Sequence, residues 1–364
     1  MKALRISPAA DRRSREAFRD LPYRLHREDP CWVAPLRRME GQRLDPARNP
    51  ALDGRPHALF LARRGEQDVG RIAAFRRANG EGGFGLFEST DDQEVAGALV
   101  AEARNWLRSC GSREAVGPMS FSTNEECGVL VSGFETPPTL LNVHNPPYYD
   151  RLLRGAGLTK AKDLFQYSFA EPVFPERYRK TSLRRVERMG IRIRTSTRAS
   201  IEEDARIFGR LFNRIWDENW GFEELSEREI VERAKQLKLI LRPQWVVIAE
   251  RDGEPVGMAL ALPDLNEIQR KHKSGALAPN LLHLLFARHR LKRVRVPLLG
   301  VVRELRRTGT EAAMLSMLWK NCRRDGVDWA EAGWVLEDNS AMHNLLLRVG
   351  FDHYKTLRMY RMEA

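Results

Sequence analysis

The sequence has few cysteines, no long apolar run and none of the short motifs that mark the commoner hydrolases and nucleotide-binding enzymes. Its four cysteines are scattered, and no two have CxxC spacing, so neither a zinc site nor a disulfide framework is indicated. The patterns GxSxG, HExxH and the Walker loop are missing. The eight histidines are not grouped at ligand spacing, and we therefore predict no bound metal.

Membrane and export signals are also missing. No apolar run reaches the roughly 18 residues that a membrane-spanning helix needs. The first residues, MKALRISPAADRRSREAF, contain no apolar segment of the kind found in secretory signals. We expect a cytoplasmic protein with no membrane association.

Length and composition predict a folded chain with more than one domain. The chain has 364 residues, of which 42% are apolar and 30% charged. At about 150 residues per domain this length corresponds to roughly two domains. Such a composition is typical of a folded protein rather than a disordered one.

Basic residues exceed acidic ones. Lys and Arg number 61 against 49 Asp and Glu, a formal net charge of +12. Residues 176–194 carry eight Arg or Lys against two Glu, and residues 269–295 carry eight with no acid. The excess favours an anionic partner such as a phosphorylated cofactor, a nucleic acid or a membrane surface. The alternative is that arginine is simply common on this surface.

The order of predicted elements repeats along the chain. Each half reads as a strand pair, a strand, a helix, a strand, a helix that ends in Gly, and a final strand. The first helix after the linker, 200–216, is expected to be capped by Ser200, and Glu203 holds the capping-box position. Prolines and the arginine cluster place a linker at 176–190. Strands that alternate with helices predict a mixed α/β sheet in each half.

The most informative stretch is LLGVVRELRRTGTEAAML, residues 298–315, in which a buried strand leads into a short basic loop and then a helix. Free N–H groups at a helix start favour an anion such as a pyrophosphate. Gly309 lets the backbone approach closely, and Arg306 and Arg307 add positive charge. A basic turn before a helix also occurs without any ligand.

This stretch, together with LEDNSAMHNLLLRVGF, resembles the GNAT (Gcn5-related N-acetyltransferase) superfamily of acyltransferases. The matching positions of the second pattern are Leu336, Asn339, Met342, Gly350 and Phe351. The resemblance covers about 170 residues of the C-terminal half, and the N-terminal half repeats the topology, as in bacterial tandem-GNAT proteins. It implies two domains, 1–175 and 191–364, joined by the basic linker 176–190. Each would be a mixed, mostly antiparallel sheet flanked by helices.

The resemblance also implies a cofactor site for acetyl-CoA or another acyl-CoA. The strand at Leu298–Val302 would offer backbone groups to the pantetheine arm, and the loop after it would hold the pyrophosphate. The implied cofactor-binding residues are Gly300, Val301, Val302, Arg306, Arg307, Thr308, Gly309, Thr310 and Asn339.

Three positions depart from the family pattern. Glu311 stands where the phosphate loop prefers Gly or Ala, and Leu346 stands where many members keep a catalytic Tyr. In the N-terminal half, the acidic stretch 88–92 occupies the place of the phosphate loop, which makes an anion site there poor. That half is predicted to be degenerate for CoA and to act as a structural partner or a substrate wall.

Acylation of an amine needs a general base, because the neutral amine is the nucleophile. Glu331, inside the apolar strand VDWAEAGWV, is the first candidate, and an ion pair with an arginine is its alternative role. Asp264, at a strand end, is the second, with a turn or cap as its alternative. Tyr360 or Tyr354 would replace the missing family tyrosine as the acid for the leaving thiolate, and the alternative is that no acid is used.

The segment IWDENWGF is the predicted acceptor-binding segment. In GNAT folds the first helix and the loop after it wall the acceptor pocket, and acids there would receive a cationic amine. The candidate residues are Trp216, Asp217, Glu218 and Trp220. The alternative is a core role for the aromatics and solvated acids.

These observations predict an acyl-CoA-dependent N-acyltransferase that acts on a small-molecule or peptide amine, as a monomer or a homodimer. One alternative is a tandem-GNAT transferase that takes an aminoacyl group from charged tRNA, whose backbone would suit the basic segments. Another is a CoA-binding protein without activity.

Overall fold

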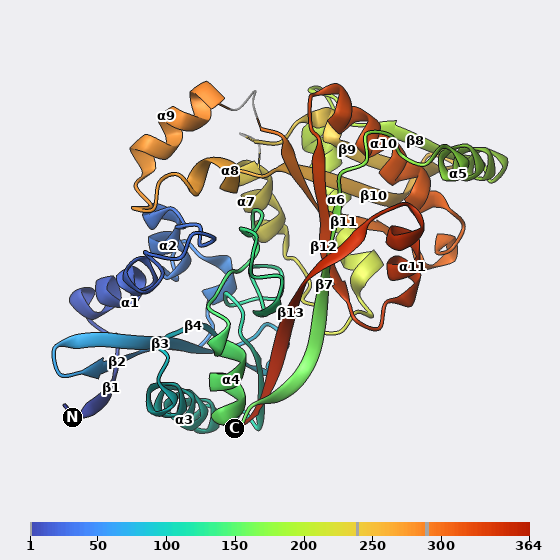
Figure 1. Cartoon of the computed structure of the whole chain (residues 1–364). Helices are drawn as coiled ribbons and strands as arrows, with labels where there is room; N and C mark the ends of the chain where they lie inside the picture. The colour runs from blue at the N-terminus through green and yellow to red at the C-terminus, as the bar shows by residue number, and fades with distance from the viewer. Residues whose placement is uncertain (1, 238–239, 288–290) are drawn as a thin grey trace. The chain divides into compact units, whose positions relative to one another are not determined.

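The computed structural model describes residues 2–237, 240–287 and 291–364 (Figure 1). The chain forms two compact units. Unit 1 consists of Met1–Leu164, Asn266–Ala287 and Lys355–Ala364, and unit 2 of Phe165–Leu265 and Arg288–Tyr354. Two of the four changes of unit fall inside the long strands β7 (Thr159–Phe169) and β13 (Asp352–Glu363), and the other two bound the segment Asn266–Ala287.

Unit 1 is a mixed sheet with helices on both faces. Its strands lie in the order β1-β2-β3-β4-β5-β13-β7, and β6 also pairs with β13. Strands β2, β3 and β4 are antiparallel neighbours, whereas β4 and β5 are parallel. In Figure 1, α1 and α2 lie on one face and α3 on the other. The elements are β1 (Leu4–Pro8), α1 (Arg12–Leu25), α2 (Arg37–Arg43), β2 (His57–Arg64), β3 (Gln67–Arg76), β4 (Gly82–Ser89), α3 (Gln93–Ser109), β5 (Glu114–Gly117), β6 (Val129–Ser132), α4 (Tyr148–Gly155), α8 (Asn266–Gln269) and α9 (Leu277–Ala287).

Unit 2 has the same order of elements. Its strands lie in the order β7-β12-β11-β10-β9-β8, in which β11 and β12 are parallel and β8 to β11 antiparallel. The elements are α5 (Glu176–Arg188), β8 (Ile191–Thr195), α6 (Ile201–Trp216), α7 (Glu227–Leu237), β9 (Val246–Arg251), β10 (Glu254–Pro263), β11 (Arg293–Val301), α10 (Thr310–Arg324), β12 (Trp329–Leu336) and α11 (Ser340–Arg348). The predicted repeat and the mixed sheets are confirmed.

Helix α3 illustrates how local sequence determines these elements. Val95, Leu99 and Ala103 recur at helical spacing, and all three are fully buried against the sheet. The Asp92 side chain accepts hydrogen bonds from the N–H groups of Glu94 and Val95, which caps the helix start. The predicted helix over this stretch is therefore correct.

Two local features of unit 2 differ from expectation. The predicted capping box at α6 is wrong. Ser200 makes no side-chain cap, because its hydroxyl donates to Asp204 and accepts the Thr197 N–H. Glu203 forms an ion pair with Arg206 instead. Residues 176–188, expected to be a linker, form helix α5, whose Ser182 and Val186 are buried. The domain boundaries expected from the sequence remain a prediction.

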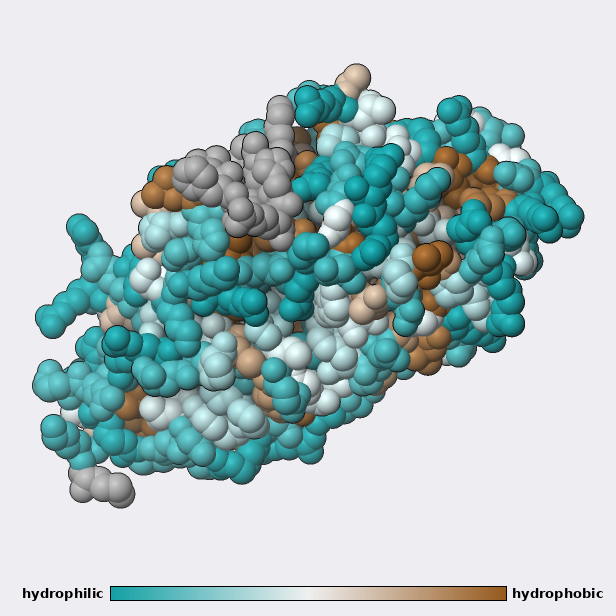
Figure 2. Space-filling model, turned by 45° about the horizontal axis from the view of Figure 1, so that its top comes forward, coloured by the Kyte–Doolittle hydropathy of each residue, from teal (hydrophilic) through white to brown (hydrophobic). Residues whose placement is uncertain are grey.

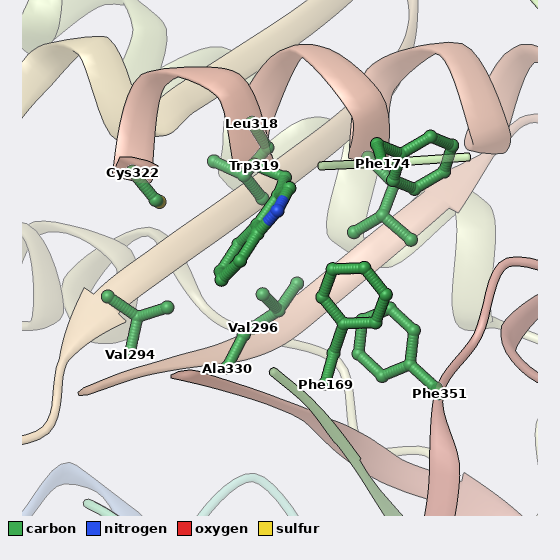
Figure 3. A pocket seen from close by; sticks show the side chains of 10 residues that line it. Phe169, Phe174, Val294, Val296, Leu318, Trp319, Cys322, Ala330 and Phe351 are labelled. Carbon is green, nitrogen blue, oxygen red and sulfur yellow. The ribbon is translucent and has the colours of Figure 1, made fainter. Parts of the chain in front are cut away.

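The core of unit 2 beneath α10 is densely packed with aromatic rings (Figure 3). The Phe169 and Phe351 rings stack with centroids 4.6 Å apart, and Trp319 meets Phe169 edge-on. The ten apolar residues shown in Figure 3 enclose only about 10 Å³, close to the minimum for one water molecule. This space is core packing rather than a ligand site.

The surface is mainly hydrophilic on the face shown in Figure 2, in keeping with the charged composition, although hydrophobic patches interrupt it. Large exposed hydrophobic residues include Leu277, Leu281 and Leu282 of α9. Within the described residues, no helix combines the length and apolar character needed to cross a membrane, and no group of His, Cys, Asp or Glu is arranged to hold a metal ion.

Replacement of Phe351 by alanine should lower the free energy of unfolding by about 3–5 kcal/mol, because a fully packed ring is lost and the surrounding core cannot close the space. Urea denaturation measures this loss. The control is Leu347→Ala, which removes a side chain that is 53% exposed and should change stability by less than about 0.5 kcal/mol. Equal effects of the two changes would contradict the packing shown in Figure 3.

Candidate functional site

Strands β11 and β12 of unit 2 separate part-way along their length. Their pairing runs from Arg293↔Trp329 to Val296↔Ala332 and then stops, although β11 continues to Val301 and β12 to Leu336. Parallel strands that part in this way leave backbone N–H and C=O groups of β11 without a partner on that side. An extended ligand can therefore hydrogen-bond there as an added strand.

A bulge in β11 lies at the start of this opening. Between the pairs Leu262↔Arg295 and Leu260↔Leu298, β11 carries one residue more than β10. A bulge of this kind re-aims the side chains that follow it. Beyond it, Gly300 lies so close to α6 that a Cβ would come within 2.9 Å of Trp216, so α6 approaches β11 directly at this point.

The predicted phosphate loop connects β11 to α10. Gly309 is the N-cap of α10 with φ +91°, a conformation that favours glycine, and Arg307 has φ +65°. The Arg306 guanidinium donates a 2.8 Å hydrogen bond to the Ile215 carbonyl, and the Thr308 hydroxyl donates to Leu305. These contacts hold the loop while the first N–H groups of α10 point toward its N-terminal end, as an anion site requires.

Helix α5 adds positive charge beside this loop. A Cβ on Gly309 would lie 3.7 Å from the Cβ of Ser182, so the buried side of α5 packs next to the helix start. Residues 176–188 contain six Arg or Lys and two Glu. Among them, Arg184, Arg185 and Arg188 are exposed. The electrostatic potential near the loop therefore favours a phosphate-bearing ligand.

Glu311 lies in the first turn of α10, where a negative charge on its carboxyl group would oppose the binding of a phosphate. Burial raises the pKa of its carboxyl group, while its own backbone N–H and Arg306 act in the opposite direction. Since the folded state holds this proton to a higher pH than the unfolded state does, the ionised carboxylate costs stability above the folded-state pKa.

Substitution Glu311→Gln should therefore raise stability at pH 7, and the advantage should vanish below about pH 4, where the wild-type carboxyl is protonated in both states. Urea denaturation at the two pH values measures this difference. Glu304→Gln, an exposed change on the same loop, is the matched control and should alter neither value. A Glu311→Gln protein less stable at pH 7 than wild type would show that the carboxylate is favourably placed.

Glu331 lies on β12 one residue before the strands part. Val294, Val296 and Ala330 face the core beneath α10, so by strand alternation Arg295 and Glu331 are on the opposite face. Glu331 is fully buried, its Oε1 lies 3.5 Å from Arg295 Nε, and its Oε2 accepts a hydrogen bond from the Tyr354 hydroxyl. Tyr354 itself is half-buried.

Neither contact of Glu331 could be located from the sequence alone. The register between β11 and β12 determines the contact with Arg295, and the position of β13 determines the contact with Tyr354. Burial, the neighbouring Glu331 carboxylate and their hydrogen bond raise the pKa of Tyr354. The phenol therefore stays protonated at neutral pH, with its proton directed at the carboxylate.

Asp264 lies in the same part of unit 2. It is almost fully buried and its carboxylate lies 3.5 Å from Arg293 Nε. The Arg293 guanidinium in turn stacks 3.9 Å over the Trp329 ring, which meets Tyr354 edge-on. The structure thus brings Asp264 and Glu331 into one buried group of charged and aromatic side chains.

Tyr360 and Asn339 are engaged elsewhere. Tyr360 is fully buried in unit 1, where its hydroxyl donates to Asp150, and this partner together with burial raises the pKa of Tyr360. The Asn339 side chain accepts a 3.1 Å hydrogen bond from the Met342 N–H and so caps α11. Leu346, in the place of the family tyrosine, is core.

The predicted acceptor segment follows α6. Trp216 is half-buried and packs on Phe212 with ring centroids 5.3 Å apart. Asp217 and Glu218 are exposed, and Glu218 forms a 2.5 Å ion pair with Arg303 of the phosphate loop. Trp220 is half-buried. The acceptor-binding role of these residues stays a prediction.

Unit 1 has no comparable anion site at α3. The Asp92 carboxylate occupies the N–H groups at the start of that helix and also pairs with Arg64 at 2.8 Å. A phosphate there would face a carboxylate already in place. Of the helices α3 and α10, α10 therefore offers the better anion site at its start.

No family model matches the chain. The chain is 36% identical over 377 residues to the bacterial ceramide synthase of Caulobacter vibrioides, covering 98% of this chain and 97% of that protein. The chain belongs to the same family. It is also 32% identical over 362 residues to protein YghO of Escherichia coli K12, covering 96% and 92% of the two chains.

Solved structures establish the fold of the chain. A tandem GNAT protein from the clavulanic acid biosynthesis pathway matches with a TM-score of 0.55 and 15% identity, over 99% of this chain and 98% of that one. A GCN5-related N-acetyltransferase from Sphaerobacter thermophilus matches with a TM-score of 0.53 and 13% identity, over 99% and 95%. The glucosamine N-acetyltransferase region of a fungal β-N-acetylglucosaminidase matches with a TM-score of 0.58 and 11% identity, over all of this chain and 38% of that protein. The predicted tandem GNAT fold is confirmed.

Proposed function

We propose that the protein is an acyl-CoA-dependent N-acyltransferase whose acceptor is a long-chain amine with hydroxyl groups. The observation that carries the proposal is the combination, in unit 2, of strands that part after Val296↔Ala332 and a phosphate loop with Gly309 at its end. The parting exposes backbone groups for the pantetheine arm, and the loop provides N–H groups and arginines for the pyrophosphate.

The donor residues in this proposal are Gly300 and Val301 at the end of β11, Val302 directly after it, and the loop residues Arg306 to Thr310. Val301 and Val302 are buried, and the Val302 N–H donates to Val256, so this backbone is held rigidly. A rigid strand edge can position a thioester carbonyl without reorganising when the amine attacks.

The proton of the attacking amine would pass to Glu331 through Tyr354. In the reaction the amine nitrogen forms a bond to the thioester carbonyl carbon, the C–S bond breaks, and CoA leaves as a thiolate. One amine proton moves to the Tyr354 oxygen as the phenol proton moves to the Glu331 carboxylate, and the thiolate takes up a proton from the medium. Tyr354 suits this role because its hydroxyl already donates to Glu331.

The acceptor class comes from the relatives. A ceramide is an amide of a fatty acid and a long-chain amino alcohol, and the Caulobacter relative is named a ceramide synthase. The identity of 36% across nearly the whole of both chains supports the same bond formation here. Because the acyl group of a ceramide is that of a fatty acid, this proposal also implies a donor with an acyl chain longer than acetyl.

The test is to incubate the purified chain with acyl-CoA of two to sixteen carbons and a panel of amines, with CoA release and amide formation followed by mass spectrometry. Amide formation from a long-chain amino alcohol is the expected result. Transfer from charged tRNA in place of acyl-CoA would overturn the donor assignment. Binding of acyl-CoA without turnover of any amine would favour a non-catalytic CoA-binding protein.

A further inference from the structure

Helix α9 of unit 1 turns an apolar face outward. Leu277, Leu281 and Leu282 are 37%, 49% and 57% exposed, and Ala278 is also exposed. At about 100° per residue these side chains share one side of the helix, and no polar residue of α9 lies among them. In Figure 1, α9 stands clear of the sheet of unit 1.

The polar residues of α9 lie on the opposite, inner face. Asn280 is buried, and its side-chain amide donates a 2.8 Å hydrogen bond to the Ala276 carbonyl. His283 Nδ1 lies 3.0 Å from His272 Nε2 in the connection before the helix. A surface helix normally has the reverse arrangement, with its apolar residues against the core and its polar residues in water. The outward apolar face therefore indicates a partner outside the fold.

Contacts of the connection before α9 determine which side of the helix faces out. The Gly275 carbonyl accepts the Arg37 N–H at 2.9 Å, and the Ser274 carbonyl accepts the Arg37 side chain at 2.8 Å. Lys273 Nζ donates a 2.9 Å hydrogen bond to the Arg27 carbonyl. The connection is thus tied to α2 and to the residues that follow α1.

Positive charge accompanies the apolar face. The connection between α8 and α9, residues 270–276, contains three basic residues and no acid, and α9 itself has no charged residue. Arg270 and Lys271 are exposed, and neither forms an ion pair among the described residues. Burial, the Lys271 ammonium and His272 lower the pKa of His283, so Lys271 lies near α9. These charges are available to an anionic partner.

An apolar face beside unpaired positive charge fits the surface of an anionic membrane. Helices of this kind lie in the plane of the interface, with apolar side chains at the acyl boundary and basic residues at the lipid phosphates. A second copy of the chain fits less well, because three leucines and an alanine expose far less than the roughly 800 Å² per partner that a stable complex buries. Two copies of the basic connection would also repel each other across a two-fold axis.

We propose that α9 docks the protein on an anionic lipid surface, with Leu277, Leu281 and Leu282 at the acyl boundary and Arg270 and Lys271 at the phosphate groups. The expectation of no membrane association rested on missing spanning and export segments, and docking of this kind requires neither. The proposal goes beyond the proposed reaction and does not depend on which amine is the acceptor.

Co-sedimentation of the full chain with lipid vesicles, without acyl-CoA or amine, tests the proposal. One set of vesicles is phosphatidylcholine alone, and the other is an equal mixture of phosphatidylcholine and phosphatidylglycerol. We expect at least about tenfold tighter binding to the anionic vesicles, because each basic residue near such a surface contributes to the attraction. The difference should shrink as salt is raised, since salt screens the lipid charge.

The double variant Leu281→Gln, Leu282→Gln tests the apolar face. Glutamine favours a helix about as well as leucine, so the change removes apolar surface with little effect on α9 itself. Binding to the anionic vesicles should weaken by about tenfold or more. The matched control is Leu347→Gln, which changes a leucine of α11 in unit 2 that is 53% exposed and should bind vesicles like the wild type.

The double variant Arg270→Gln, Lys271→Gln tests the charge separately. It should weaken binding to the anionic vesicles by about tenfold and leave binding to phosphatidylcholine unchanged. Arg13→Gln with Arg15→Gln removes the same charge from exposed positions of α1 in the same unit, and its binding should stay within about twofold of wild type. Thermal melts show whether each variant is folded.

Three results would contradict the proposal. The first is equal binding of the wild type and the leucine double variant to anionic vesicles. The second is equal binding of the wild type to both kinds of vesicle. The third is a wild-type dimer in light scattering that the leucine substitutions convert to a monomer, because the apolar face would then join two copies of the chain. Since the assay contains neither acyl-CoA nor an amine, its outcome is independent of whether the proposed reaction occurs.

Discussion

Replacement of Gly309 by glutamate should weaken acyl-CoA binding by about 100-fold or more. Two effects act together. A non-glycine residue at φ +91° adds backbone strain of about 1–3 kcal/mol. The new carboxylate also stands at the N-terminal end of α10, where it repels a pyrophosphate. Calorimetric titration of acyl-CoA into wild type and variant measures the change, and about 100-fold corresponds to roughly 2.8 kcal/mol.

Gly326→Glu is a matched control for this experiment. Gly326 has φ +87° and follows the C-terminal end of the same helix, so the change carries similar strain without a charge near the phosphate loop. It should lower stability but leave acyl-CoA affinity unchanged. Loss of acyl-CoA affinity in both variants to the same degree would show that strain in α10, rather than a phosphate site, is responsible.

Glu331→Gln should lower kcat by about 10²- to 10⁴-fold, the usual range for loss of a general base. The amide keeps the shape of the side chain but cannot take up the proton that Tyr354 passes on. Tyr354→Phe should have a similar effect, and the double variant should be no slower than either single variant, because the two residues act in one proton path. Steady-state kinetics with a long-chain amino alcohol measures all three.

Asp204→Asn is the control that tests whether loss of any buried ion pair lowers kcat as Glu331→Gln is expected to. Asp204 is 1% exposed and pairs with Arg194 at 2.8 Å in the same unit, away from the separation of β11 and β12. It should lose stability with kcat within about twofold of wild type, as expected for a residue outside the proton path. If Glu331→Gln behaves in the same way, Glu331 is a structural ion pair with Arg295 and not the base.

The sequence contained much of the fold because its local patterns agree with the structure. Period-3.6 stripes such as that of α3, the strand pairs and the helix-ending glycines predicted the element order of both units. The loop from Arg306 to Gly309 could be found for the same reason, since strand, loop and helix are consecutive in the chain. The tandem fold followed from the resemblance of these consecutive elements to the GNAT pattern and from the repeated element order.

Contacts between distant residues could not be derived in this way. Arg295 meets Glu331 only because of the register between β11 and β12, and Asp29 meets His144 across 115 positions of sequence. No pattern in the sequence around these residues indicates either pair. The helix at 176–188 was missed because arginines and flanking prolines obscured the buried Ser182 and Val186, which become visible only against α10.

The membership of β13 in unit 1 has a consequence for the order in which the chain can be completed. Residues 355–364 belong to unit 1, pair with β5 through Tyr360↔Gly117 and place Tyr360 and Met362 in its core. They follow every segment of unit 2 in the chain, so a ribosome makes all of unit 2 before the sheet of unit 1 can close. Until then the β5 edge is an unpaired strand, which is a common starting point for aggregation. The earliest-made half of the protein is therefore the last to be finished, and its folding depends on a few residues more than two hundred positions away.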